Sequence, residues 1–515
     1  MSNTLNNNDP LLRESLKDAA PVTRKECLLL FSSVILSLII HSYFVFDGFG
    51  EPDAARIATQ AVLYHSCPEQ YKISQVTPLY QIALVGCLSL GLDKTAIPGL
   101  MNYTNLVLGS FSLIPLYLLW RRISSPWVST LSCVLYSLTP AFWFANIYGM
   151  PHLPAFFFLL WAALLFLRAL SCTRSSAFIG YSALSAGLMI LSLTCKVDVA
   201  LYSGIFIGLV AACRAWTKRN IAAALMIPLA ALGISFIAIK FFYMTRLLSV
   251  RYASNWHAEW PTDITALKST IPVWSVGAVF LAGILFSGLY GLFNPSLRRY
   301  VMLAIAWAMP ASLFWCLRWG NSIRHMMIVF SVLIFLLALT LIHCCPGRRK
   351  LYLIIGTAIL LNYVWMPVEH RYVNKGGRLI ETARSIQAYH NTIMQNGIDL
   401  CNAPCDEVVL VGQESIPFVI WELLLRYDLK TKPETSETSY TFFDEHSQSW
   451  QCRTTDAVTL TLETSSGHRK IVRYFYVPLN TTLLNDSPIP CWSCQESVTV
   501  VNRPSEGLET GDSPR

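Results

Sequence analysis

Long apolar runs separated by short polar loops constrain this 515-residue chain more than any other feature. Each run has roughly the 17–25 residues that an α-helix needs to cross a bilayer. They fall at 27–46, 103–120, 127–147, 153–170, 177–195, 198–213, 221–243, 272–292, 300–317, 323–343 and 351–366. Hydrophobic residues make up 54% of the chain and charged residues 14%, which excludes a set of soluble domains. The sequence therefore predicts an all-α polytopic membrane protein with about 11 transmembrane helices.

The charged residues predict how these runs are oriented, because cytoplasmic loops carry an excess of Lys and Arg. Basic groups occupy every second loop: Arg24/Lys25, Arg121/Arg122, Arg168/Arg174, Arg214/Lys218/Arg219, Arg298/Arg299 and Arg348/Arg349/Lys350. Acids gather in the alternate loops: Glu51, Asp53, Glu69, Asp93, Asp198, Glu259 and Asp263. This alternation predicts a cytoplasmic N-terminus and an external position for everything after residue 367. The net charge of +8 then reflects membrane topology and not nucleic-acid binding.

The N-terminal residues 1–26 form a polar cytoplasmic tail that is too acidic for a signal peptide, so 27–46 is expected to be a retained first span. Two long external loops are expected, at 47–102 and 244–271. Within the first of them, "VTPLYQIALVGCLSLGL" (76–92) is apolar enough to suggest a twelfth span. Counting it would reverse the orientation of every later basic group. It is therefore interpreted as a juxtamembrane or re-entrant helix.

The composition changes after residue 366, where the predicted transmembrane domain 27–366 ends. Strand-like segments such as "EVVLV" and "RKIVRYFYV" alternate with the helix-like "PFVIWELLLRYD", while 374–394 has apolar residues at helical spacing. These patterns predict an external α/β domain over 367–502. The polar tail 503–515 is expected to be disordered.

Cysteines and sequons in the predicted external regions leave alternatives open. Five cysteines lie away from the spans, and they could form disulfides or a four-cysteine zinc site: Cys401, Cys405, Cys452, Cys491 and Cys494. Three asparagines begin N-x-S/T sequons, which serve as glycosylation sites only in a eukaryotic host: Asn102, Asn480 and Asn485.

The segment "GFGEPDAARIA" (48–58) directly follows the first span. If a helix begins at Pro52, Asp53 and Arg56 are at i and i+3 on one face. One interpretation is a capped helix start with a surface ion pair. The other is a carboxylate, Glu51 or Asp53, that acts as a general base at the outer membrane surface.

Cations follow at the external ends of later spans. Lys196 and Asp198 lie at one such turn and could simply neutralise each other. Arg318, Arg324 and His325 flank another, in "CLRWGNSIRHMMIVF". The arginines could be interfacial anchors, or they could hold a lipid-linked phosphate. His41 and His152 are expected to be packing residues, because no metal-ligand spacing surrounds them.

These motifs together resemble the glycosyltransferase C superfamily, in particular its protein O-mannosyltransferase and aminoarabinose-transferase branch. "GEPDAARIA" is similar to the acidic motif after the first span of that family, and "VTPLYQIAL" to its P-P-L-Y stretch. The segment 140–170 resembles its third and fourth spans, and 322–339 its late span opening with Arg-Tyr. The likeness covers most of 27–345. Gly50-Glu51 replaces the usual Asp-Glu, and Arg324-His325 replaces Arg-Tyr, so the base stays open between Glu51 and Asp53.

The resemblance implies transfer of a sugar from a polyprenyl-phosphate donor to a protein, lipid or glycan acceptor hydroxyl at the periplasmic or lumenal face. Glu51 or Asp53 would be the base, Arg56 would orient the acids, and Arg324 with Arg318, His325 and Lys196 would bind the donor phosphate. Some branches use a divalent cation, for which this sequence offers no ligand set. The alternatives are a transporter or lipid flippase with an external cationic vestibule, and a non-catalytic scaffold.

Overall fold

The computed structural model describes the chain in these residues: 22–45, 48–49, 52–66, 68, 73–74, 77–244, 248–249, 278–318, 323–345, 356–357, 368–370, 373–377, 407–412, 416–429, 434–443, 449–463, 469–476 and 491–494. They belong to two compact units. The helical unit comprises Met1–Gly50, Lys72–Gly86 and Ala96–Gln387, and the C-terminal unit comprises Glu51–Tyr71, Cys87–Thr95 and Ala388–Arg515. The predicted domain boundaries at 26, 366 and 502 remain predictions.

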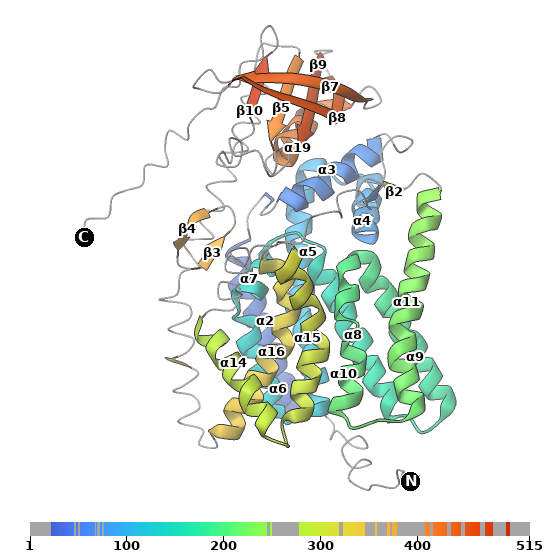
Figure 1. The fold of residues 1–515 in the computed structure, drawn as a ribbon, viewed down its shortest axis with the longest axis vertical. Helices are drawn as coiled ribbons and strands as arrows, with labels where there is room; N and C mark the ends of the chain where they lie inside the picture. Colours follow the sequence, from blue (N-terminus) through green and yellow to red (C-terminus); the bar gives the residue numbers. More distant parts are fainter. Residues whose placement is uncertain are drawn as a thin grey trace, which may run out of the picture. The chain divides into compact units, whose positions relative to one another are not determined.

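Membrane-length helices dominate the helical unit (Figure 1). Its helices are α2 (Arg24–Ser42), α5 (Ile97–Ile123), α6 (Pro126–Ser137), α7 (Pro140–Ile147), α8 (His152–Ser171), α9 (Ser175–Cys195), η2 (Val197–Tyr202), α10 (Ile205–Ala212), α11 (Lys218–Met244), α14 (Ala278–Phe293), α15 (Arg298–Arg318) and α16 (Ile323–Cys344). Among the described residues, six helices are long and apolar enough to span a membrane, or seven if α6 and α7 count as one. The chain is thus a multi-pass integral membrane protein, while the count of about 11 spans stays a prediction.

The run 127–147, expected to be one span, is not one continuous helix. Helices α6 and α7 meet at a bend of 62°. Pro140 opens α7, and proline has no N–H to donate to the carbonyl of Tyr136, so the first helix cannot continue. The Thr139 hydroxyl accepts a hydrogen bond from the Phe142 N–H at 3.4 Å and caps the second helix.

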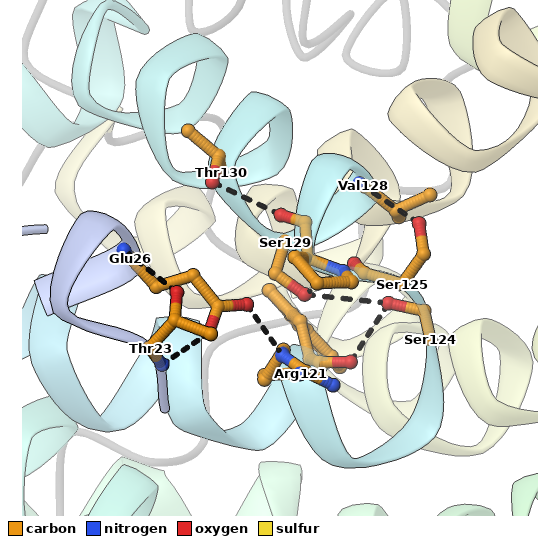
Figure 2. Close-up of polar contacts among 10 residues, drawn as sticks. Thr23, Glu26, Arg121, Ser124, Ser125, Val128, Ser129 and Thr130 are labelled. Carbon is orange, nitrogen blue, oxygen red and sulfur yellow. Dashed lines mark hydrogen bonds and ion pairs between the residues drawn. The ribbon is translucent and has the colours of Figure 1, made fainter. Parts of the chain in front are cut away.

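Basic clusters that were predicted to be cytoplasmic have contacts with neighbouring helix ends in the helical unit. Glu26 caps α2 in a capping box with Thr23, and its carboxylate also accepts a hydrogen bond from Arg121 Nε at 3.0 Å (Figure 2). The Tyr300 hydroxyl donates to the Ile123 carbonyl at 2.6 Å, and Arg219 donates to the Cys172 carbonyl at 3.1 Å. These bonds join the ends of α2, α5 and α15 to one another and the ends of α8 and α11 to each other, as the alternation of charges requires.

The two long loops that were predicted to be external contact each other within the helical unit. Strand β1 (Ile73–Ser74) of the first loop pairs in parallel with β2 (Leu248–Ser249) of the second. The apolar segment 76–92 forms α4 (Pro78–Ser89), whose 12 residues extend about 18 Å and cannot cross a hydrocarbon core of about 30 Å. This length supports the juxtamembrane interpretation.

A mixed sheet and two helices make up the described part of the C-terminal unit (Figure 1). Its strands are β5 (Glu407–Gly412), β6 (Asp428–Leu429), β7 (Glu434–Phe443), β8 (Ser449–Glu463), β9 (Arg469–Tyr476) and β10 (Cys491–Cys494). The order is β10-β5-β9-β8-β6, with β7 also on β8, and only β5 and β9 are parallel. Helix α19 (Ile416–Arg426) packs on β5 and β6 and also on α3 (Pro52–Ser66).

Strands β5 and β9 and helix α19 occupy segments that the sequence pattern assigned to strand and helix. The prediction of a helix over 374–394 is wrong at its start, where β4 (Val373–Gly377) pairs antiparallel with β3 (Val368–His370). Gly376 and Gly377 there have low helix propensity. The rest of that segment lies outside the described residues.

Candidate active site

The segment that leads into the acidic motif is anchored in the helical unit. Helix α2 ends at Ser42, and the chain becomes buried again at Gly48 and Phe49, whose side chain is 2% exposed. Glu51 lies outside the described residues. Since Pro52 already opens α3, only Gly50 and Glu51 separate the buried Phe49 from that helix.

Helix α3 presents Asp53 and Arg56 together on one face. Its other face is apolar and buried, with Ala54, Ala55, Ile57, Ala58, Ala61, Val62 and Leu63. Arg56 Nη1 lies 3.4 Å from Asp53 Oδ1, and the two side chains are 30% and 36% exposed. The predicted helix start at Pro52 and the predicted i, i+3 pair are confirmed. A pair this exposed contributes at most about 1 kcal/mol to stability.

A second ion pair lies in the helical unit, at the turn between α9 and η2. Lys196 Nζ is 3.1 Å from Asp198 Oδ2, and these side chains are only 12% and 14% exposed. The pair is thus far more buried than that of Asp53 and Arg56. The ion pair that one interpretation of the sequence expected here is present.

Arg318, Arg324 and His325 are placed by their backbones alone. Arg318 is the last residue of α15, and Arg324 and His325 lie in the first turn of α16. Because α15 and α16 pack side by side, these three positions come from adjoining helix ends. Their side chains and the turn 319–322 lie outside the described residues.

The histidine predictions can be tested at His41. Its side chain is 2% exposed, and its Nδ1 accepts a hydrogen bond from the Asn146 amide at 3.0 Å. The Ser37 hydroxyl lies 3.1 Å from the same nitrogen and 3.0 Å from that of Ser110. His41 is therefore a hydrogen-bonded packing residue that joins α2, α5 and α7, as expected.

Sequence reasoning missed two buried asparagines on α5. Asn102 and Asn105 are both 0% exposed. The Asn102 amide donates to the Gly48 carbonyl at 2.8 Å, and its oxygen accepts the Gly149 N–H at 2.7 Å. The sequon at Asn102 is thus not a glycosylation site in the folded protein, because no enzyme can reach this amide. Asn480 and Asn485 lie outside the described residues.

The described residues contain no group of three or more His, Cys, Asp or Glu side chains that could hold a metal ion. The described part of the chain therefore offers no such group of ligands for the divalent cation that the family resemblance raised. The side chains of Cys401, Cys405, Cys452, Cys491 and Cys494 lie outside the described residues, so disulfides and zinc both stay open there.

Comparisons with known proteins bear on the fold. No protein-family model and no curated protein sequence matches the chain. Among solved structures, ArnT from Cupriavidus metallidurans bound to undecaprenyl phosphate aligns over 78% of this chain and 75% of its own, with 14% identity and a TM-score of 0.50. The chain has a glycosyltransferase C fold.

Two further solved structures with this fold are similar to a smaller degree. The Archaeoglobus fulgidus oligosaccharyltransferase in its apo form aligns over 78% of this chain and 64% of its own, with 12% identity and a TM-score of 0.47. The S. cerevisiae protein O-mannosyltransferase Pmt1-Pmt2 complex bound to the sugar donor aligns over 46% of this chain and 35% of its own, with 19% identity and a TM-score of 0.36. The resemblance inferred from the motifs is confirmed at the level of the fold.

Proposed function

We propose that this protein is a membrane glycosyltransferase that moves a sugar from a polyprenyl-phosphate donor to an acceptor hydroxyl on the external face. The observation that carries the proposal is the acidic segment directly after the first span, with its Asp53–Arg56 pair at the start of α3, in a glycosyltransferase C fold. The similar ArnT structure holds undecaprenyl phosphate, the lipid phosphate that such a reaction would release.

Glu51 is assigned as the general base, and Asp53 as the group that orients it together with Arg56. The carboxylate of Asp53 lies 3.4 Å from the Arg56 guanidinium, and this cation favours a charged Asp53 that does not take up a proton. Glu51 is therefore assigned as the acid that accepts the proton. In the reaction, the acceptor hydroxyl gives its proton to Glu51 as its oxygen bonds to the anomeric carbon. The bond from that carbon to the phosphate oxygen breaks, and its electron pair leaves with the lipid phosphate.

Cations at the external helix ends would stabilise the charge that grows on the leaving phosphate. Lys196, Arg318, Arg324 and His325 are assigned this role. Lys196 is held by Asp198 in a mostly buried pair, so its ammonium group is fixed before a substrate arrives. A cation that is already held in place does not have to move when the phosphate leaves. It can therefore stabilise the transition state with little reorganisation energy.

The proposal is tested by supplying the purified full-length protein with a panel of polyprenyl-phosphate sugars and acceptor extracts, and measuring release of the lipid phosphate. Glu51→Gln is expected to lower kcat about 10²- to 10⁴-fold, because a general base contributes that much. Asp53→Asn is expected to cost less, since the Glu51 carboxylate remains.

Asp93→Asn is the matched control for these acids. Asp93 belongs to the same predicted external loop, and its carboxylate accepts hydrogen bonds from the Thr95 N–H and hydroxyl, which an Asn side chain can also accept. This variant should keep its turnover. Absence of release with every donor would refute the glycosyltransferase proposal, and turnover that survives the Glu51→Gln, Asp53→Asn double change would refute the assignment of the base.

A further inference from the structure

Asn102 joins two chain segments that are remote in sequence. Its amide nitrogen donates to the Gly48 carbonyl at 2.8 Å, and its amide oxygen accepts the Gly149 N–H at 2.7 Å. The side chain is 0% exposed, so water does not compete for these bonds. An amide has a donor and an acceptor on one rigid group, and Asn102 therefore imitates a backbone peptide between the two segments.

The surroundings are built around this contact. A Cβ atom at Gly149 would collide with the Met101 Cβ and would lie 3.0 Å from the Asn102 oxygen, so only glycine lets the turn after α7 approach α5 this closely. One turn further along α5, the Asn105 amide nitrogen lies 2.5 Å from the Tyr148 carbonyl and 2.6 Å from that of Met150. Asn105 thus fixes the turn after α7, while Asn102 connects that fixed turn to Gly48.

Gly48 lies three residues before Glu51. The next residue, Phe49, is buried at 2% exposure and provides a second anchor. In the sequence only Gly50 separates Phe49 from Glu51. A restraint on Gly48 and Phe49 is consequently a restraint on the backbone that carries the proposed base.

We propose that Asn102 is a positioning residue that sets the start of the acidic segment by holding Gly48 against the Tyr148–Met150 turn. This inference rests on the proposed function in that Glu51 is taken as the base. Loss of the contact would leave the fold and the donor site in place but let the Glu51 backbone shift. A base that is misplaced by about 1 Å lowers turnover about 100-fold, whereas substrate affinity changes little.

The test compares Asn102→Asp with Asn105→Asp in the full-length protein. At position 102 a carboxylate cannot donate to the Gly48 carbonyl. At position 105 the same change removes donation to the Tyr148 and Met150 carbonyls but leaves the Gly48 bond. Both residues are equally buried on one helix, so the pair separates a role toward residues 48–51 from a general loss of packing.

Hydrogen exchange gives a result that does not depend on the reaction. Asn102→Asp should speed amide exchange over residues 44–51 at least about tenfold, and Asn105→Asp should leave that segment near its wild-type rate. Equal exchange at 44–51 in wild type and Asn102→Asp would overturn the proposed restraint. If Asn102→Asp does not fold, Asn102→Leu, which is of similar size and cannot donate to the Gly48 carbonyl, takes its place with the same expectation, and Asn105→Leu becomes its control.

The kinetic comparison uses whichever polyprenyl-phosphate sugar the panel identifies. Asn102→Asp should lower kcat about 10- to 100-fold with KM for the donor within about twofold, and Asn105→Asp should lower kcat much less at a similar loss of thermal stability. Equal loss of kcat in both variants, or an unchanged kcat in Asn102→Asp, would overturn the positioning role. If no donor is turned over, both the proposed function and the catalytic part of this inference are refuted. The exchange experiment then still decides whether Asn102 restrains residues 48–51.

Discussion

The Asp53–Arg56 and Lys196–Asp198 ion pairs differ mainly in burial. The side chains of Asp53 and Arg56 are about one-third exposed, while those of Lys196 and Asp198 are 14% exposed or less. Water screens the first pair and hardly reaches the second. Breaking a pair that water does not reach leaves one charge without compensation, so the two pairs should contribute differently to stability.

Double-mutant cycles should show this difference. Lys196→Met with Asp198→Asn is expected to give a coupling free energy of about 1–3 kcal/mol, and Arg56→Met with Asp53→Asn about 0.2–1 kcal/mol. Denaturation of the purified protein in detergent measures both cycles. A coupling for Lys196 and Asp198 no larger than that for Asp53 and Arg56 would contradict the burial of the first pair.

Residue types alone predicted several of these contacts. A proline followed by an acid and, three residues later, an arginine indicated a helix start with an ion pair, and α3 has both. The buried state of Asn102 could not be predicted, because an asparagine on an apolar helix followed by Tyr103 and Thr104 has the pattern of a glycosylation sequon. Only its hydrogen bonds with Gly48 and Gly149 distinguish a buried structural asparagine from an exposed sequon.

At the scale of elements, the close packing of α10 on α15 depends on two glycines. Gly204 and Gly208 are four residues apart and face α15, as in the small-xxx-small pairs of membrane helices. A Cβ atom at Gly204 would collide with the Ala306 carbonyl oxygen and lie 2.9 Å from its carbon. Backbone atoms of a packed helix cannot move aside as a flexible side chain can.

Gly204→Ala should therefore lower the free energy of unfolding by about 1–3 kcal/mol, the usual cost of overpacking. Gly187→Ala in α9 is the control, since a Cβ atom there meets nothing within 4 Å. Its free energy of unfolding should stay unchanged or rise by up to about 1 kcal/mol, because alanine favours a helix interior over glycine. Thermal denaturation in detergent compares the two variants, and similar stability for both would refute the α10–α15 approach.

Helix α3 belongs to the C-terminal unit, although in the sequence it directly follows the first helix of the helical unit. It follows the first span closely, yet its apolar face packs against α19, whose Trp421 and Leu424 are 3% and 2% exposed. Lys94 also donates to the Leu424 carbonyl at 3.3 Å. No local pattern in "PDAARIATQAV" identifies α19, about 350 residues later, as its partner.

At the scale of the whole molecule, the alternation of basic and acidic loops agrees with the contacts at one end of the helical unit. Glu26 with Arg121, and Tyr300 with the Ile123 carbonyl, bring together loops that the positive-inside rule assigned to one side. Which side of the membrane this is remains a prediction from the charges.

Reporter fusions test that prediction. Green fluorescent protein at the N-terminus should fluoresce and alkaline phosphatase there should be inactive, because the N-terminus is predicted to be cytoplasmic. At the C-terminus, alkaline phosphatase should be active and the fluorescent protein dark. A fluorescent C-terminal fusion would place residues 367–502 on the cytoplasmic side. If the N-terminus is also cytoplasmic, the number of spans would then be even and not 11.

The sequence by itself determined the membrane class, the order of the main helices and the acid–arginine pair at the start of α3. These depend on local composition and on spacing of a few residues, which a linear pattern records. The tertiary structure decided what depends on contacts between distant segments: the pairing of β1 with β2, the packing of α3 on α19, and the Asn102 contacts with Gly48 and Gly149. Such contacts form because buried polar groups and apolar faces must find partners, and only the folded chain specifies which partners they find.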